Sequence, residues 1–441
     1  MEYLAIIVGV FFIVFLTIKR WNPIIMGIIA TSAVAVVSGL PLGEALTDTF
    51  FSGFSSMVKS LLPPIFAGCL LCETYTRSGA VVKIADALIN VLFKNEAQMS
   101  NMKKYAIATL SLILVTGIIS YFGINSLVVL IATYPISLRI MERAGIPKRF
   151  VMGMLSGGVY GLSLSAPGTT EIVNVLGMQI VGTPAHAGLV AGAIAVVVEV
   201  TVMTIILSVM INKAVANGET FAYGSKDHPF TGSTEELPSL FISVIPLIVL
   251  LVIFNVFSVD IFIATMIGWL LSVVLFWRYL NGKQEFFELC QEGAANAFGP
   301  ISAVGSLVGV TTVIQSLPAF TKLMESVFSM NISVVLMLIF SVAFVASLTG
   351  SSTAAMRLGL PMVLDRCRAA GLADAFIHRV ACFASTTGDT LPWAASVMIN
   401  LSISDMKLEE VYPPMFATTV IATSCGTAIC AIIMYLFPFL P

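Results

Sequence analysis

Four short segments bring glycine or proline together with hydroxyl, amide or carboxyl side chains inside otherwise apolar sequence. In chain order, the first to fourth breaks are Tyr121–Ser126 (YFGINS), Ser163–Thr170 (SLSAPGTT), Thr349–Thr353 (TGSST) and Thr386–Pro392 (TTGDTLP). Glycine and proline interrupt helices, and each new helix N-terminus leaves N–H groups without intrahelical partners. Such N-termini suit a carboxylate, and neutral Ser, Thr and Asn groups add hydrogen bonds to it. The breaks therefore predict a binding site for an oxygen-rich anion.

Charged residues beside the breaks are functional candidates because a charge at membrane depth is costly. Arg357 follows the third break and suits bidentate pairing with a substrate carboxylate. The alternatives are an internal pair with Glu171 or Asp389, or a side chain that reaches the membrane surface. Glu171 follows the second break and Asp389 lies in the fourth. Both are candidate coupling-proton sites, since burial favours an uncharged carboxylic acid. Glu73 and Glu199, also in apolar segments, are interpreted as partners of polar groups between helices.

The composition indicates a multi-pass membrane protein. Of 441 residues, 58% are hydrophobic and 10% charged, against roughly 25% charged in soluble proteins. Basic residues follow the first apolar run, Leu4–Ile18, instead of preceding it, which favours a first membrane helix over a signal peptide. The net charge of −2 gives no indication of a nucleic-acid partner. Cys69 and Cys72 lack a second Cys or His pair nearby, so neither a metal site nor a cofactor is expected.

The two halves of the chain resemble each other. Reading from Gly123 against Thr349, three pairs align without a gap: Ser126 with Ser352, Pro135 with Pro361, and Gly145 with Gly371. Pro167 meets Pro392 after one residue of slip, and Pro64 corresponds to Pro300. Chance similarity between Gly- and Ala-rich helices is the alternative. Paired interrupted segments in a duplicated membrane protein indicate a transporter site between two repeats.

The polar segment 212–238 divides the repeats, 1–211 and 239–441, and is expected to be a cytoplasmic linker. The predicted fold is all-α, with about ten spanning helices, two re-entrant hairpins and discontinuous helices at the site. The distribution of Lys and Arg predicts that most positively charged loop residues lie on the same side of the membrane as the linker. Arg379 is expected on the opposite side. An odd number of crossings in the first half makes the second half inverted in the membrane, the arrangement used for alternating access.

Several longer motifs resemble one family. IHRVACFASTTGDTLPWAASVMINL, GSSTAAM, PGTTEIVN followed by GTPAHAGL, and FAGCLLCETYTRSGAVVKIADAL together resemble the GntP (gluconate permease) family, especially its hydroxybutyrate-permease-like branch. The resemblance covers nearly the whole chain and implies a proton-coupled secondary transporter for organic anions in the inner (plasma) membrane. It also implies an elevator-type movement of a transport domain, approximately 100–185 and 331–404, against the scaffold of a homodimer, approximately 1–95 and 239–295.

The resemblance implies hairpin tips at Asn125 with Ser126 and at Ser351 with Ser352, and unwound helices at 167–170 and 388–391. This chain departs from the LDxLPHNG pattern of the branch, because Trp393 and two alanines replace its His, Asn and Gly. The relatives' substrate therefore does not carry over directly. The candidate binding residues are Asn125, Ser126, Gly168, Thr169, Thr170, Ser351, Ser352, Thr353, Arg357 and Thr390, with Asp389 and Glu171 as coupling sites.

The sequence thus predicts uptake of a small organic anion, of the gluconate or short-chain hydroxy acid class, by proton symport through the lipid bilayer. Sodium-coupled carboxylate symport and cation/proton antiport are the alternatives, since hydroxyl-rich and carbonyl-rich breaks also coordinate Na⁺. An enzyme is not expected. No Ser/His pair, HExxH motif or hydrolase-like pair of membrane aspartates is present in the sequence.

Overall fold

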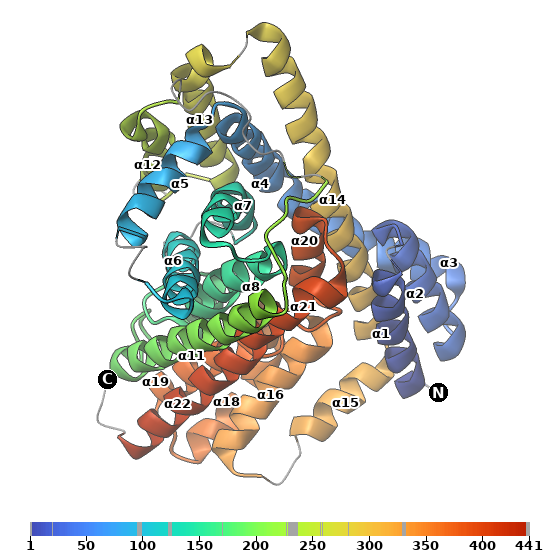
Figure 1. Cartoon of the computed structure of the whole chain (residues 1–441). Coiled ribbons are helices and arrows are strands. Elements are labelled where there is room, and N and C mark those ends of the chain that lie inside the picture. The colour runs from blue at the N-terminus through green and yellow to red at the C-terminus, as the bar shows by residue number, and fades with distance from the viewer. Residues whose placement is uncertain are drawn as a thin grey trace.

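The computed structural model describes residues 2–19, 21–94, 99–121, 126–169, 171–225, 227, 237–255, 257, 259–280, 282–328 and 332–437. These residues form helices and no strand (Figure 1). Two candidate binding residues, Asn125 and Thr170, lie outside the described residues, as does most of the first break. The prediction of an all-helical protein is confirmed.

Six helical stretches in the described part of the chain are long and apolar enough to cross a membrane: Leu42–Arg77, Asn101–Tyr121, Leu189–Ala216, Ile261–Tyr279, Lys283–Gln315 and Leu408–Leu436. Shorter apolar helices accompany them, including several that end or begin at a break. A span needs about 20 residues, so a helix interrupted partway across falls below that length. The protein is a multi-pass membrane protein, and the number of its crossings stays a prediction.

The first half contains these elements: α1 (Glu2–Ile18), α2 (Pro23–Ser38), α3 (Leu42–Glu44), η1 (Ala45–Phe50), α4 (Phe51–Arg77), α5 (Ala80–Leu92), α6 (Asn101–Tyr121), α7 (Ser126–Ala144), η3 (Lys148–Phe150), α8 (Val151–Ser156), η4 (Gly157–Leu162), α9 (Ser163–Ser165), α10 (Ile172–Val181) and α11 (Leu189–Ala216). Helix α11 continues five residues into the segment expected to be linker, since 212–216 are still helical.

The second half contains α12 (Leu240–Asn255), α13 (Ile261–Phe276), η6 (Trp277–Tyr279), α14 (Lys283–Gln315), α15 (Pro318–Phe328), α16 (Val334–Thr349), α17 (Ser352–Ala354), η7 (Ala355–Gly359), α18 (Leu360–Ala369), α19 (Asp374–Thr386), α20 (Ala395–Ser404), α21 (Leu408–Phe416), η8 (Ala417–Ala422) and α22 (Thr423–Leu436). The order of long, short and interrupted helices follows that of the first half, with α6 and α16 each ending at a break. Whether the halves are inverted in the membrane stays a prediction.

The helices that lead to the second and fourth breaks lie in the interior. Every residue of α8, η4 and α9 is buried, as is α19 from Phe376 to Thr386. A helix that is apolar on all sides is a helix surrounded by protein or lipid. The long helices α11 and α22 lie side by side against this interior, and α14 packs along α4 (Figure 1). The breaks are therefore held inside the protein, where freed backbone groups find partners.

Gly158 allows the closest of these approaches. A Cβ atom at this position of η4 would lie 2.3 Å from the carbonyl oxygen of Ile113 in α6 and 2.1 Å from Oγ1 of Thr116. Backbone atoms cannot rotate away, so α6 and η4 would have to separate. Segment η4 is a π-helix, a form that occurs mostly as single-turn bulges at functional sites.

We expect Gly158→Ala to lower the free energy of unfolding by about 1–3 kcal/mol, the usual cost of overpacking an interior. The measurement is thermal unfolding of the purified protein in detergent. The matched control is Gly43→Ala, because a Cβ at Gly43 would have no atom within 4 Å. Equal stability of the two variants would contradict the close approach of α6 and η4.

Candidate functional site

The third break turns tightly against the fourth. Helix α16 ends at Gly350, which has a φ of 60°, and a Cβ there would lie 2.8 Å from Cα of Ala394. Glycine is therefore required both for the left-handed turn and for the close approach. The hydroxyl of Ser351 caps the next helix by accepting a hydrogen bond from the amide of Ala354 at 3.3 Å. The next residue, Ser352, faces the fourth break.

Ser352 and Asp389 join the third and fourth breaks. The Ser352 hydroxyl donates a hydrogen bond to Oδ2 of Asp389. Asp389 itself is buried and only 4% exposed. The other carboxyl oxygen, Oδ1, accepts no hydrogen bond from the described residues. Ser396 holds the backbone of the break by donating to the Asp389 carbonyl at 2.9 Å. One buried carboxyl oxygen thus remains for a proton, a cation or a solute.

Glu171, directly after the second break, lies against hydroxyl groups at both ends of the first break. Its Oε1 accepts a hydrogen bond from Ser120 at 2.7 Å and lies 3.5 Å from the hydroxyl of Ser126. Ser163 donates to Ser120 at 3.2 Å, which extends the hydroxyl chain into α9. No cation pairs with Glu171 within the described part of the chain. The carboxyl group is therefore held only by neutral hydroxyl and backbone groups.

The second break is bound to the end of α6 by its own backbone and hydroxyl groups. Gly168 has a φ of 82°, and the Tyr121 phenol donates to the Pro167 carbonyl at 3.0 Å. In return, the Thr169 hydroxyl donates to the Tyr121 carbonyl at 3.1 Å. These bonds satisfy groups that the interrupted helix leaves free, as the interior requires.

The two serines that the repeat alignment matches have the same role in the structure. Ser126 lies at the start of α7 and Ser352 at the start of α17, and the hydroxyl of each faces a carboxyl group of a neighbouring break. Helix α9 contacts both η4 and α19, and α10 contacts α17. The described parts of the breaks therefore lie close to one another, a proximity that the sequence indicates only through the alignment.

Other candidate residues are placed differently. The Thr390 hydroxyl is fully buried and 2.6 Å from that of Thr419 in η8, so it already has a partner inside the protein. Thr353 is half-buried beside Ser352. Arg357 is exposed on η7 and makes no ion pair with Glu171 or Asp389 in the described structure. The structure thus gives no support to an internal pair with either carboxylate, and the contact of Arg357 with a solute stays a prediction.

Arg379 is a buried residue that sequence reasoning misses. It is expected at a membrane flank, but its side chain is 0% exposed inside α19. Its guanidinium donates to four oxygens of the first half: Ser165 O at 3.1 Å, Ala185 O at 3.0 Å, Ala187 O at 2.9 Å and Asn174 Oδ1 at 3.0 Å. The only sequence signal is the pair His378-Arg379 in an apolar helix. Arg379 thus holds one carbonyl group within the second break, that of Ser165, and three oxygens that follow the break in the chain.

Glu199 and Glu73 each contact a polar group of a neighbouring helix, which confirms their interpretation as interhelical partners. Glu199 is fully buried in α11 and accepts a hydrogen bond from the Ser165 hydroxyl at 3.2 Å. Glu73 of α4 accepts one from the Asn296 amide of α14 at 2.9 Å. In the described residues, no group of three or more His, Cys, Asp and Glu side chains is arranged to hold a metal ion.

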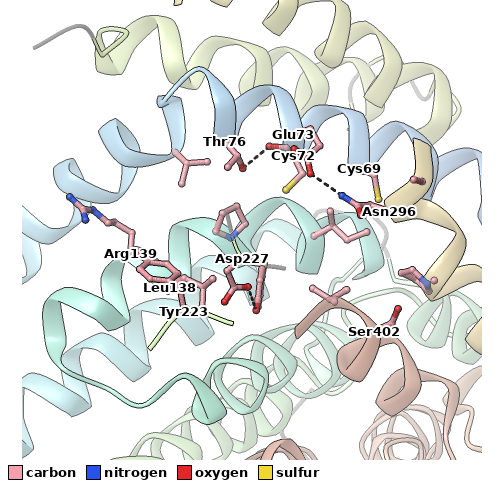
Figure 2. Close-up of a pocket in the computed structure, with 18 of the residues that line it drawn as sticks. Cys69, Cys72, Glu73, Thr76, Leu138, Arg139, Tyr223, Asp227, Asn296 and Ser402 are labelled. Atoms are coloured by element: carbon pink, nitrogen blue, oxygen red, sulfur yellow. Dashed lines mark hydrogen bonds between the residues drawn. The ribbon is translucent and has the colours of Figure 1, made fainter. Parts of the chain in front are cut away.

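A cavity of about 250 Å³ lies at some distance from the breaks along α7 and α20. Figure 2 shows Cys69, Cys72 and Glu73 of α4 on one side of it and Tyr223, Asp227 and Ser402 on the other. Most of the wall is apolar, with a few polar groups, as is usual for small-molecule sites. None of its residues is among the candidate binding and coupling residues from the sequence.

We expect Arg379→Lys to lower the free energy of unfolding by about 1–3 kcal/mol, because a lysine cannot reach all four oxygens and at least one buried carbonyl is left without a partner. The measurement is thermal unfolding in detergent. Arg366→Lys, at an exposed position of α18, is the control and should change stability by less than about 0.5 kcal/mol. Unchanged stability of Arg379→Lys would show that the buried guanidinium does not hold the second break.

Comparisons with known proteins give a family and two relatives. A family model described as GntP family permease matches residues 1–276. The chain is 22% identical to YxjC of Bacillus subtilis (strain 168), described as an uncharacterized transporter, over 98% of each protein. Among solved structures, it resembles the YdaH transporter of Alcanivorax borkumensis, described as having an unusual topology, with a TM-score of 0.44, 12% identity and 89% of each chain covered.

Proposed function

Because the chain belongs to the GntP permease family, we propose that it takes up a small organic anion by proton symport across the inner membrane. The solute is of the gluconate or short-chain hydroxy acid class. That the protein is a membrane transporter follows from the family; the solute and the coupling ion are the proposal. They rest on the chemistry of the breaks.

The observation that carries the proposal is the pair of serine–carboxyl contacts at the breaks, Ser352 with Asp389 and Ser126 with Glu171. Neither carboxyl group has a cationic partner in the described structure. An unpaired charge is costly to bury, so a proton is the simplest way to neutralise such a group. Helix N-termini and hydroxyls beside it would receive the carboxylate of the solute.

Coulomb repulsion couples the proton to the anion. Two negative charges 4 Å apart at an effective dielectric constant of about 20 repel each other by about 4 kcal/mol. That repulsion corresponds to roughly three orders of magnitude in affinity. An anion beside ionised Asp389 would therefore bind weakly, whereas an anion beside protonated Asp389 avoids the repulsion. Proton and solute load together, and the pair crosses without net charge.

The arrangement of the halves fits alternating access. In the proposed mechanism, approximately 100–185 and 331–404 move as a transport domain against a scaffold of approximately 1–95 and 239–295, in a homodimer. Two inverted repeats provide two equivalent open states from one structure. The repeated order of helices supports this division.

We expect purified protein in proteoliposomes to accumulate gluconate when the outside is acidic, and to lose accumulation when a protonophore removes the gradient. The assay uses radiolabelled gluconate in sodium-free buffer, followed by a panel of short hydroxy acids. A requirement for Na⁺ would favour sodium symport, and ion exchange without an organic solute would favour an antiporter. Flux of no organic acid, or flux indifferent to both ions, contradicts the proposal. A chemically altered product would instead favour an enzyme.

We expect Asp389→Asn to reduce proton-driven accumulation at least tenfold while gluconate still exchanges across the membrane at equilibrium. The amide cannot release a proton but leaves the surrounding break in place. Asp365→Asn, on the exposed face of α18, is the matched control and should behave as wild type. Normal accumulation by Asp389→Asn would exclude Asp389 as the coupling residue.

A further inference from the structure

The cavity in Figure 2 lies where helices of both halves meet. Its walls include Ile131 and Tyr134 of α7, Ser402 and Ile403 of α20, and residues of α4 and α14. In sequence these elements belong to both parts proposed to move against each other. A cavity at such an interface changes shape when the parts move, which a cavity inside one rigid part does not.

Two helices lead from the breaks to this cavity. Helix α7 begins at Ser126, beside Glu171, and helix α20 begins at Ala395, just after the fourth break. At a rise of 1.5 Å per residue, Ile131 lies about 7 Å along α7 from its start and Ser402 about 10 Å along α20. Both helices thus present their first turns to the breaks and their later turns to the cavity. The wall of the cavity thus begins about one to two helical turns beyond the breaks, on the side of the linker residue Asp227.

The charged residues of the wall are already paired within the protein. Asp227 lies 2.6 Å from the Lys148 ammonium group and accepts a hydrogen bond from the Tyr134 phenol at 3.0 Å. Arg139 donates to Glu142 at 2.8 Å. Such pairs leave little free charge to hold an ion tightly. The cavity therefore suits a solute in passage better than a bound one.

The neutral part of the wall suits a hydroxylated solute. Ser402 of α20 faces α14 where Gly299 leaves room for it, since a Cβ at Gly299 would lie 2.8 Å from the Ser402 hydroxyl. The Asn296 side chain, which donates to Glu73, and the Tyr223 phenol, which donates to Glu142, keep acceptor capacity. Asn296 and Gly299 are both exposed, so the cavity is accessible from the surface of the protein.

We propose that this cavity is the vestibule through which a small hydroxylated carboxylate passes between the breaks and the aqueous phase on the side of Asp227. The proposal rests on the proposed function and adds the route by which the solute reaches the breaks. It assigns a role to Ser402, Asn296 and Tyr223, which lie outside the breaks. A vestibule differs from a binding site in that blocking it stops transport without abolishing binding at the breaks.

The test is Ser402→Cys in a background whose seven native cysteines are replaced by alanine, because Cys69 and Cys72 also line the cavity. The variant is folded and reconstituted before a membrane-impermeant maleimide is added to one side of the vesicles at a time. We expect labelling from one side only, and at least a tenfold loss of gluconate uptake once the bulky adduct is attached. A small methylthio adduct at the same position should leave at least half of the uptake. Because the label is added after folding, a loss of uptake cannot come from misfolding of the variant.

The controls are the cysteine-free parent, which must retain gluconate uptake when treated in the same way, and Ser225→Cys in that background, an exposed position outside the cavity wall. Labelling of Ser225→Cys should leave uptake unchanged. Labelled Ser402→Cys should still be stabilised by gluconate in a thermal unfolding assay, because the breaks remain free. Labelling from both sides or neither, normal uptake after labelling, or loss of gluconate binding would each overturn the vestibule. The sidedness of labelling needs no solute, so absence of wild-type gluconate uptake contradicts the proposed function and not this inference.

Discussion

The structure depends on satisfying the backbone groups that interrupted helices leave free in the interior of a membrane protein. An unpaired backbone group in hydrocarbon costs several kcal/mol, so a break persists only where other residues supply partners. Arg379 supplies them to the second break from the opposite half of the chain, and Tyr121 and Thr169 add local bonds. The third break is closed by the turn at Gly350 and the cap at Ser351. These contacts keep polar groups at a depth where continuous helices would present none.

The same constraint gives the buried carboxyl groups their chemical character. Asp389 and Glu171 lie among hydroxyl and backbone groups and have no cationic partner in the described structure. A guanidinium is buried close by, yet Arg379 donates to oxygens of the backbone and of Asn174 and not to a carboxylate. The positive charge is thus used to hold the fold, and the two carboxyl groups have no cation beside them in the described structure. This separation of roles is the physical basis of the proposed proton coupling.

Much of the fold follows from local sequence. Apolar runs of spanning length predict helices, and Gly168, Gly350 and Gly388 mark the interruptions because left-handed turns and close contacts require glycine. The match of Ser126 with Ser352 predicts that both serve one site, and each is found facing a carboxyl group. The exposure of Arg357 is not predictable in this way. The sequence around a charged residue in an apolar run does not show whether its helix face points toward the site or away from it.

The sequence by itself determined that this is an all-helical membrane protein of the GntP permease family, with polar breaks that contain Ser352 and Asp389. Only the tertiary structure decided that Arg379 crosses to the second break, that Ser120 contacts Glu171, and that Ser402 and Glu73 share a cavity. The reason is that periodicity and turn chemistry act over a few residues, whereas these contacts join residues up to hundreds of positions apart. Such contacts depend on how whole helices pack, which no local pattern records.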